Sequence, residues 1–322
     1  MKANPAKRMG TATAALMAAA TLSACGGGGG DTERTAPPAV DAGALLSMGE
    51  TLRARHVAGL RHDGANGTTE PDDGDWGFSL RLDGDGRYVM TMAGVEHTFT
   101  DEEFDPEGNR GRGSASSDED HGMGFTFLTA RHDEIEAGNS DGEHWMILHA
   151  RSNDVSPGRD AELRGFVVLG NTTPAADFSR LEGTTATYGG DFRGTESGKF
   201  ALARLDVFPR EYAGNLTSDV YLSNVTLTAD FGAGTISGKL HEFRLAGSPD
   251  DLIEGLEMTM PETPFSGASF GGDFGISGNG SVFAGAEASY GGSFYQRDAD
   301  TVIGTVSLAS DDETGIGWFI AN

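Results

Sequence analysis

One segment of the chain, Gly267–Gly271, has the serine pattern of a hydrolase nucleophile. Its sequence, Gly-Ala-Ser-Phe-Gly, fits Gly-x-Ser-x-Gly, in which the central serine attacks a carbonyl group. That chemistry requires a strand-to-helix turn beneath the serine, with an acid and a histidine later in the chain. No histidine follows His241, and Ser269 lies in a glycine-rich stretch without a helical pattern. We therefore expect no catalytic residue here and no enzymatic activity.

Four histidines in the first half of the chain lie near acidic residues and have side chains that can bind a metal ion or haem. The histidines are His121, His132, His144 and His149, and the acidic residues are Asp118, Glu119, Asp120, Asp133 and Glu134. The zinc-site spacing His-Glu-x-x-His does not occur, and a strand would place His144 and His149 on opposite faces. We expect ordinary surface histidines, with a metal or haem contact as the alternative, and predict no cofactor and no metal site.

Cys25, the only cysteine of the chain, stands at the end of a short export signal. A positively charged start precedes an apolar stretch, residues 11–22, which is too short to span a bilayer. The stretch ends in Leu-Ser-Ala-Cys, the pattern at which bacterial lipoproteins are cleaved and acylated. We predict that residues 1–24 are a signal peptide and that Cys25 is lipidated. An ordinary secretory signal with a chance cysteine is the alternative.

The residues that follow Cys25 indicate where the protein goes. Gly26, rather than an acidic residue, comes next, as in Gram-negative lipoproteins that pass to the outer membrane. Residues 25–54 begin with a run of glycines and continue with prolines and charged residues, a composition typical of a flexible tether. Within this region and just beyond it, residues 41–62 predict either one short helix or an irregular lead-in. We expect an outer-membrane protein that is anchored by lipid and faces the cell surface.

The chain is strongly acidic, with 49 Asp and Glu residues against 23 Lys and Arg residues and a net charge of −26. Loss of the signal peptide removes three basic residues and no acidic one, so the net charge becomes −29. Such a charge repels phosphate backbones, and nucleic acid is therefore not expected as a partner. A basic protein or a cation would suit it. Adaptation to a salty habitat is the open alternative.

Residues 55–175 are predicted to form a small, handle-like β domain. Apolar and polar residues alternate over 78–82, and apolar residues recur over 88–92, with Asp83-Gly84-Asp85-Gly86 between them as a hairpin turn. Residues 101–122 are polar and aperiodic, which predicts a loop. Three further short strands are expected at 125–130, 145–150 and 165–169.

Residues 176–322 are predicted to form an antiparallel β-barrel of about eight strands, so that the whole chain is all-β. The expected strands are 184–192, 199–207, 219–231, 234–243, 268–274, 286–295, 300–308 and 316–321. Glycine weakens a strand, so its repeated use inside these strands, as at Gly292 and Gly304, indicates the sharp coiling of a closed barrel. Closure also removes exposed strand edges. An open sandwich is the alternative that the same spacing permits.

Three segments of this second half resemble the barrel domain of transferrin-binding protein B-like surface lipoproteins. They are Gly183-Thr-Thr-Ala-Thr-Tyr188, Val225-Thr-Leu-Thr-Ala-Asp230-Phe231 and Tyr290-Gly-Gly292-Ser-Phe294-Tyr295. The resemblance departs from the family at Gln296, where a glycine is usual. It covers about the last 150 residues and implies a handle-like β domain before the barrel.

The resemblance implies a non-enzymatic binding protein that captures a protein or an iron- or haem-bearing ligand for nutrient uptake. Its partners would be the membrane, through Cys25, a protein ligand and an outer-membrane uptake receptor. No ligand-binding residue is carried over, because no ligand-specific motif matches. A structural or envelope-interaction lipoprotein that faces the periplasm is the alternative function.

Overall fold

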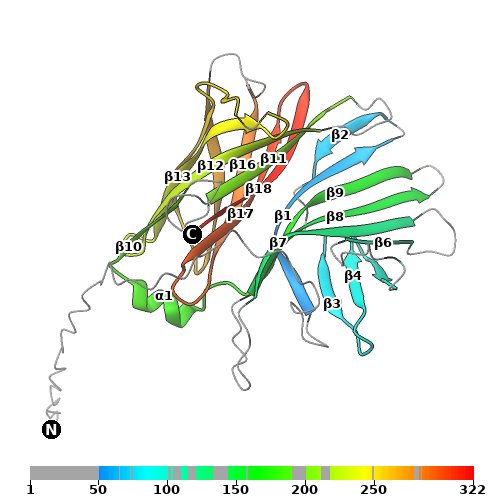
Figure 1. Ribbon diagram of the computed structural model, residues 1–322, viewed down its shortest axis with the longest axis horizontal. Helices are drawn as coiled ribbons and strands as arrows, with labels where there is room; N and C mark the ends of the chain where they lie inside the picture. The colour runs from blue at the N-terminus through cyan, green and yellow to red at the C-terminus, as the bar shows by residue number, and fades with distance from the viewer. Residues whose placement is uncertain are drawn as a thin grey trace, which may run out of the picture. The chain divides into compact units, whose positions relative to one another are not determined.

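The computed structural model describes residues 51–322 with short gaps, and all of them belong to one compact unit, Arg34–Asn322. The gaps are residues 65, 73, 75, 101–102, 104–109, 115–120, 133–143, 157–158, 191–200, 212–217, 249, 279–282 and 284. In the described part, eighteen strands form two antiparallel sheets, and there is one short helix (Figure 1). The predicted all-β fold class is therefore confirmed. Cys25 and the first part of the predicted tether lie outside the described residues.

The first half of the chain forms an open sheet, which we call the handle sheet. Its strands pair in the order β5-β4-β3-β1-β9-β8-β7-β6, and β2 pairs with β1. The strands are β1 Thr51–Asp63, β2 Thr68–Pro71, β3 Ser79–Leu82, β4 Tyr88–Met92, β5 Val95–Thr98, β6 Arg110–Ser114, β7 His121–His132, β8 His144–Ser156 and β9 Arg159–Gly170. The long strand β1 is central, since it pairs with β3 near its start and with β9 along most of its length.

The predicted hairpin between β3 and β4 is confirmed, and Asp83 explains its geometry. The Asp83 carboxylate accepts hydrogen bonds from the backbone N–H groups of Asp85 and Arg87, both at 2.9 Å. These bonds hold the pKa of Asp83 below its usual value, and the bond from Arg87 has the larger effect. Gly86 takes a φ of 80°, a left-handed conformation that glycine adopts without strain.

Two sequence predictions for the handle sheet are wrong. Residues 51–62, expected within a helix or lead-in and partly within the tether, belong to β1, because pairing with β3 and β9 overrides their helical propensity. The sheet therefore begins before residue 55. Residues 110–114, expected in a loop, form β6 along one side of β7. An edge strand is held by backbone hydrogen bonds, so its sequence needs no apolar alternation.

The second half of the chain forms a closed barrel. Eight strands pair in a ring, β12-β11-β18-β17-β16-β15-β14-β13, and β13 pairs back to β12. The short strand β10 shares one edge of β12 with β11. The elements are α1 Ala175–Leu181, β10 Thr185–Gly189, β11 Ala201–Pro209, β12 Asp219–Asp230, β13 Thr235–Leu245, β14 Glu257–Pro264, β15 Ser269–Ser277, β16 Glu287–Tyr295, β17 Thr301–Ala309 and β18 Glu313–Ala321. The predicted eight-stranded barrel is confirmed, and the open sandwich is wrong.

Strand β14 is absent from the strands predicted from the sequence, and its prolines are unusual in a strand that pairs on both sides. Met258 and Met260 nevertheless point into the barrel, where both are buried. The pairing with β13 shifts register between Ile236 and Gly238, opposite the region of Pro261. This irregularity explains how a proline is accommodated where a regular ladder would need an N–H group.

Aromatic rings fill the barrel and explain two of its strand glycines. A Cβ atom at Gly292 would overlap the Phe270 ring, and one at Gly304 would overlap the Phe319 ring. Both rings belong to the barrel core. The prediction that these glycines meet a geometric need is therefore confirmed, since the rings lie where side chains would be.

A second apolar cluster, which we call the junction cluster, joins the handle sheet to the outer wall of the barrel. From the handle sheet it takes Ala58, Leu60, Trp145, Ile147, Phe166 and Val168, and from the barrel Phe208, Tyr295, Ile303, Ile316, Trp318 and Ile320. Consequently β17 and β18 are buried on both faces over most of their length. The opposite face of the handle sheet carries a separate core that includes Leu80, Met90 and Phe125.

Candidate functional site

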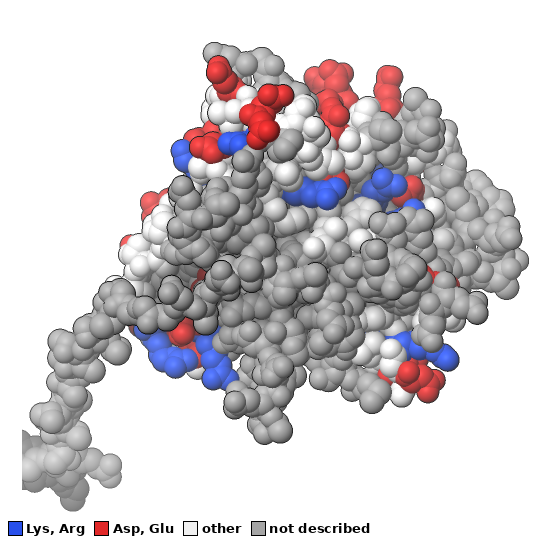
Figure 2. Space-filling view, in the orientation of Figure 1, with Lys and Arg blue, Asp and Glu red and all other residues white. Residues whose placement is uncertain are grey.

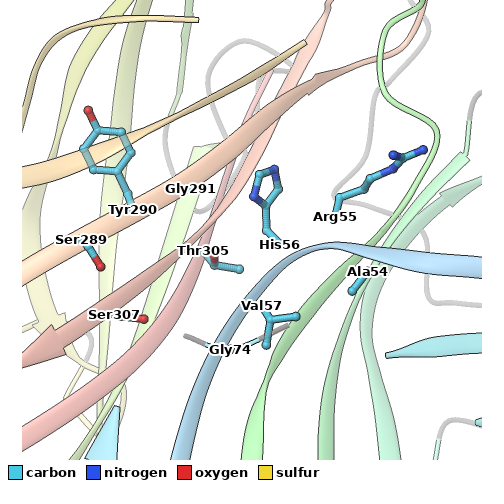
Figure 3. Close-up of a pocket in the computed structure, with 10 residues that line it drawn as sticks. All are labelled: Ala54, Arg55, His56, Val57, Gly74, Ser289, Tyr290, Gly291, Thr305 and Ser307. Atoms are coloured by element: carbon cyan, nitrogen blue, oxygen red, sulfur yellow. The ribbon is translucent and has the colours of Figure 1, made fainter. Parts of the chain in front are cut away.

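A groove lies at the junction of β1 with strands β16 and β17 of the barrel. It has a volume of about 460 Å³, within the range typical of small-molecule sites. Figure 3 shows Arg55, His56 and Val57 of β1 on one side and Ser289, Thr305 and Ser307 of the barrel on the other.

A β-bulge in β1 places two of the polar groups at this groove. Ala54 pairs with Leu169 and His56 with Val168, so Arg55 is an extra residue between two consecutive partners. A bulge breaks the alternation of faces and re-aims side chains. Arg55 and His56 therefore both line the groove instead of pointing to opposite sides of the sheet.

His56 connects the handle sheet to two serines of the barrel. Its Nε2 lies 2.7 Å from the Ser293 hydroxyl oxygen, which lies 2.9 Å from the hydroxyl oxygen of Ser269. A Cβ atom at Gly291 would come 3.1 Å from His56 Nδ1, so the absence of a side chain there lets the imidazole approach β16. Burial, and secondly the charge of Arg55, lower the pKa of His56 to about 4. The ring is therefore neutral at pH 7.

The structure thus connects a histidine, through Ser293, to Ser269, the serine of the hydrolase-like pattern, which the sequence alone did not indicate. His56 lies upstream of the motif and 237 residues from Ser293, and no local pattern connects them. The arrangement is nevertheless poor for catalysis. Ser293 is fully buried, an imidazole with a pKa of about 4 is a weak base, and within the described residues no carboxylate hydrogen-bonds to His56. Ser269 is also the first residue of β15, which follows β14 in a hairpin, so it does not lie at a strand-to-helix turn. The chain of hydrogen bonds instead ties β1 to the barrel.

The barrel wall of the groove consists of small hydroxylated residues in register. Ser289 lies directly opposite Ser307, and Gly291 opposite Thr305, across the β16–β17 pair. Tyr290, between two of these positions, points the other way and its hydroxyl lies 2.6 Å from Thr263 Oγ1 (Figure 3). The alternation of side chains along β16 therefore gives the barrel an aromatic interior and a polar groove wall.

The histidines singled out in the sequence do not form one site. The backbones of His132 and His144 are paired across β7 and β8, whereas His121 pairs with Asp154 at the far end of β7. His149 packs its ring against Phe166, with the ring centroids 5.5 Å apart. Among the residues that the structure describes, no group of three or more His, Cys, Asp or Glu side chains could hold a metal ion. The described part also contains no helix long and apolar enough to cross a membrane.

No protein-family model matches the chain, and no curated protein matches it. Among solved structures, it is similar to transferrin binding protein B from serogroup B Neisseria meningitidis, with 15% identity and a TM-score of 0.38 over 83% of this chain and 43% of that chain. A transferrin binding protein B double mutant from Haemophilus parasuis gives 13% identity and a TM-score of 0.41, over 83% of this chain and 45% of that chain. The N-lobe domain of lactoferrin binding protein B of Moraxella bovis gives 13% identity and a TM-score of 0.33, over 86% of this chain and 100% of that chain.

The similar structures thus include the family that the sequence resembles. The chain spans less than half the length of the first of them.

Proposed function

We propose that this protein is an outer-membrane lipoprotein, anchored through Cys25, that binds a protein ligand and has no enzymatic activity. In this proposal residues 1–24 are the signal peptide, the tether extends from Cys25 to residue 50, and a handle domain and a barrel domain follow, divided near residue 175. The observation that carries the binding role is a pair of exposed leucines in an acidic loop at one end of the barrel.

The packed interior of the barrel favours binding on its outer surface. Phe294 lies near the centre of a group of rings and contacts Phe178 of α1, with ring centroids 5.4 Å apart. Further aromatic contacts to Phe294 come from Tyr188, Phe231, Phe265 and Phe270. Rings at this density leave little space for a ligand. Loops and outer surfaces are then the parts of the barrel that can recognise a partner.

Residues 245–254 run from the last residue of β13 into the connection to β14 and present the exposed leucines; we call them the Leu252 loop. Leu245 is 39% exposed and Leu252 is 48% exposed, and they are the large hydrophobic residues that stand out as exposed in the described part. Backbone hydrogen bonds hold the loop: Ser248 N–H donates to the Leu245 carbonyl at 2.9 Å, and Ile253 N–H to the Phe243 carbonyl at 2.8 Å. An ordered loop loses less entropy on binding than a mobile one.

Acidic side chains surround the Leu252 loop. Asp250, Asp251 and Glu254 are exposed within it. The neighbouring connections at the same end of the barrel add Glu211, Asp219, Asp311, Asp312 and Glu313. Figure 2 shows acidic side chains gathered along the upper edge of the face that it draws.

Burial, and then the carboxylates of Asp219 and Asp312, raise the pKa of Glu313, a sign that negative charge is concentrated here. An apolar centre with an acidic rim suits a protein partner that presents an apolar side chain within a basic surface.

The binding proposal is tested with Leu252→Asp and a matched variant, Ala233→Asp, in the β12–β13 turn at the opposite end of the barrel. The purified full-length proteins are used in pull-down experiments with protein extracts from the environment in which the cells grow. Captured proteins are identified by mass spectrometry. We expect a partner that wild type and Ala233→Asp retain and that Leu252→Asp loses by at least about tenfold, because a hot-spot contact is worth about 2 kcal/mol. Equal capture by Leu252→Asp would show that the loop is not the binding surface.

The anchor is tested by Cys25→Ala. The substitution removes the sulfur that would carry the lipid, so the protein should leave the membrane fraction or remain unprocessed. Labelled fatty acid should enter wild type and not the variant. Persistent labelling of Cys25→Ala would refute the anchor while leaving the binding surface untouched. The finer part of the proposal, an iron- or haem-bearing ligand passed to an uptake receptor, rests on the sequence resemblance.

A further inference from the structure

Several polar groups converge on the groove between β1 and the barrel without a protein partner. Within the described residues, the hydroxyls of Ser289 and Thr305 and the Nδ1 atom of His56 make no hydrogen bond, although all three residues line the groove. Polar groups in a folded protein are normally paired with protein, water or ligand. A volume of about 460 Å³ is many times the roughly 30 Å³ that one water molecule occupies, so the groove can admit an organic molecule.

Arg55 gives the groove its charge. It is the only charged side chain among the ten residues that line the groove, since His56 is neutral at pH 7. Arg55 Nε donates to the Gly170 carbonyl at 3.3 Å, which fixes one edge of the guanidinium. Across the described part of this strongly acidic chain, no carboxylate forms a salt bridge with Arg55. The outer guanidinium nitrogens are therefore available for a planar anion such as a carboxylate.

The two chemistries lie on opposite sides of His56. Figure 3 shows Ser289 and Ser307 on one side of the imidazole and Arg55 on the other, with Thr305 beside the ring. Hydroxyl side chains donate and accept hydrogen bonds, so they suit a ligand that itself carries hydroxyl groups. Val57 adds a small apolar surface on the facing wall. A ligand that spans the groove would place an anionic end at Arg55 and a hydroxylated chain along the barrel wall.

We propose that the groove between β1 and strands β16 and β17 is a binding site for a small hydroxylated carboxylate. The β-bulge brings Arg55 and His56, consecutive residues of β1, to the groove, and Gly291 leaves room for the ring. The site lies on the side wall of the barrel, whereas the Leu252 loop lies at its end. Binding of the small ligand is therefore independent of the proposed protein partner, and either can fail without the other.

The test is isothermal titration calorimetry of the purified full chain with sodium gluconate, which carries one carboxylate and a hydroxylated chain. Glucose lacks the carboxylate and acetate lacks the hydroxyls, so both should bind at least about tenfold more weakly than gluconate. Arg55→Gln should weaken gluconate binding by about tenfold or more, since an ion-paired hydrogen bond is lost. Thr305→Val should weaken it by about fivefold, the equivalent of one neutral hydrogen bond.

Arg53→Gln is the matched control, because Arg53 is an exposed arginine two residues earlier on the same strand and does not line the groove. It should bind gluconate like wild type. Absence of binding at 10 mM gluconate, or unchanged affinity in Arg55→Gln, would overturn the proposal. Equal affinity for glucose would refute the claim that a ligand carboxylate binds Arg55. Equal affinity for acetate would refute the claim that the ligand hydroxyls contribute to binding. Circular dichroism of each variant shows whether a lost signal reflects unfolding.

Discussion

The outer wall of the barrel has two parts that face the handle sheet, and they differ in chemistry. On β17 the outward residues run from Ile303, fully buried in the junction cluster, to Thr305 and Ser307 at the groove. On β16 they run from Tyr295, also in the cluster, to Ser289 at the groove. Within a few residues the same strands change from an apolar, packed contact to a polar wall, on which Thr305 is 4% and Ser307 is 8% exposed. One end of this strand pair thus stabilises the contact with the handle sheet, and the other end lines the groove.

The two faces of β16 should respond very differently to substitution. Gly292 faces inward, where a side chain would overlap the Phe270 ring, and Gly291 faces outward against the His56 ring. Gly292→Val should lower the free energy of unfolding by about 3 kcal/mol, because the core is overpacked. Gly291→Val should cost about 1 kcal/mol, since the His56 ring can shift into the groove. Denaturant unfolding of both purified variants measures the difference, and equal losses would contradict this view of the two faces.

A smaller effect is expected from the pH dependence of the contact that His56 makes with Ser293. The folded-state pKa of His56 is about 4, below the ordinary value of 6.5, so the unfolded state binds the proton more tightly. The contribution of His56 is therefore complete above pH 6.5 and is lost as the pH falls toward 4. Between pH 7 and pH 5 the loss should be about 2 kcal/mol, reduced where water reaches the ring.

His56→Gln separates this contribution from that of the carboxylates, which titrate in the variant as in wild type. Unfolding free energies of both proteins are compared at pH 7, 6 and 5. The curve of wild type should fall more steeply than that of His56→Gln. Parallel curves would show that the imidazole is not held neutral by its place between the handle sheet and the barrel.

Alternation of apolar residues predicted the barrel well because most of its strands have one face in the core. In β17, Val302, Val306 and Leu308 point inward, as the pattern indicates. Strand β14 was harder to predict, because it contains Pro261 and because the irregular pairing that accommodates this proline leaves no signal in the sequence. Gln296, where the family that the chain resembles has glycine, does adopt a left-handed φ of 71°. The departure noted in the sequence therefore falls at a real turn.

The candidate groove was harder to predict, because its residues come from segments more than 200 positions apart. The bulge that aims Arg55 and His56 depends on the pairing of β1 with β9, and β1 was expected to be helical or irregular. One feature of the sequence does indicate the covered wall beside the groove. Ile303, Ile316 and Trp318 occupy the outward positions of barrel strands, which predicts that another part of the protein covers this wall.

The most direct test of this division of the wall compares Ile303→Ala with Thr305→Val in denaturant unfolding of the full chain. The two residues are neighbours on one face of β17, one in the junction cluster and one in the groove. Ile303→Ala should lower the free energy of unfolding by about 2–5 kcal/mol, because it leaves a cavity in a packed contact. Thr305→Val should change it by less than about 1 kcal/mol, because the Thr305 hydroxyl has no hydrogen bond to lose within the described residues and valine leaves no large cavity. Equal losses in the two variants would contradict the separation of an apolar, packed junction from a polar groove.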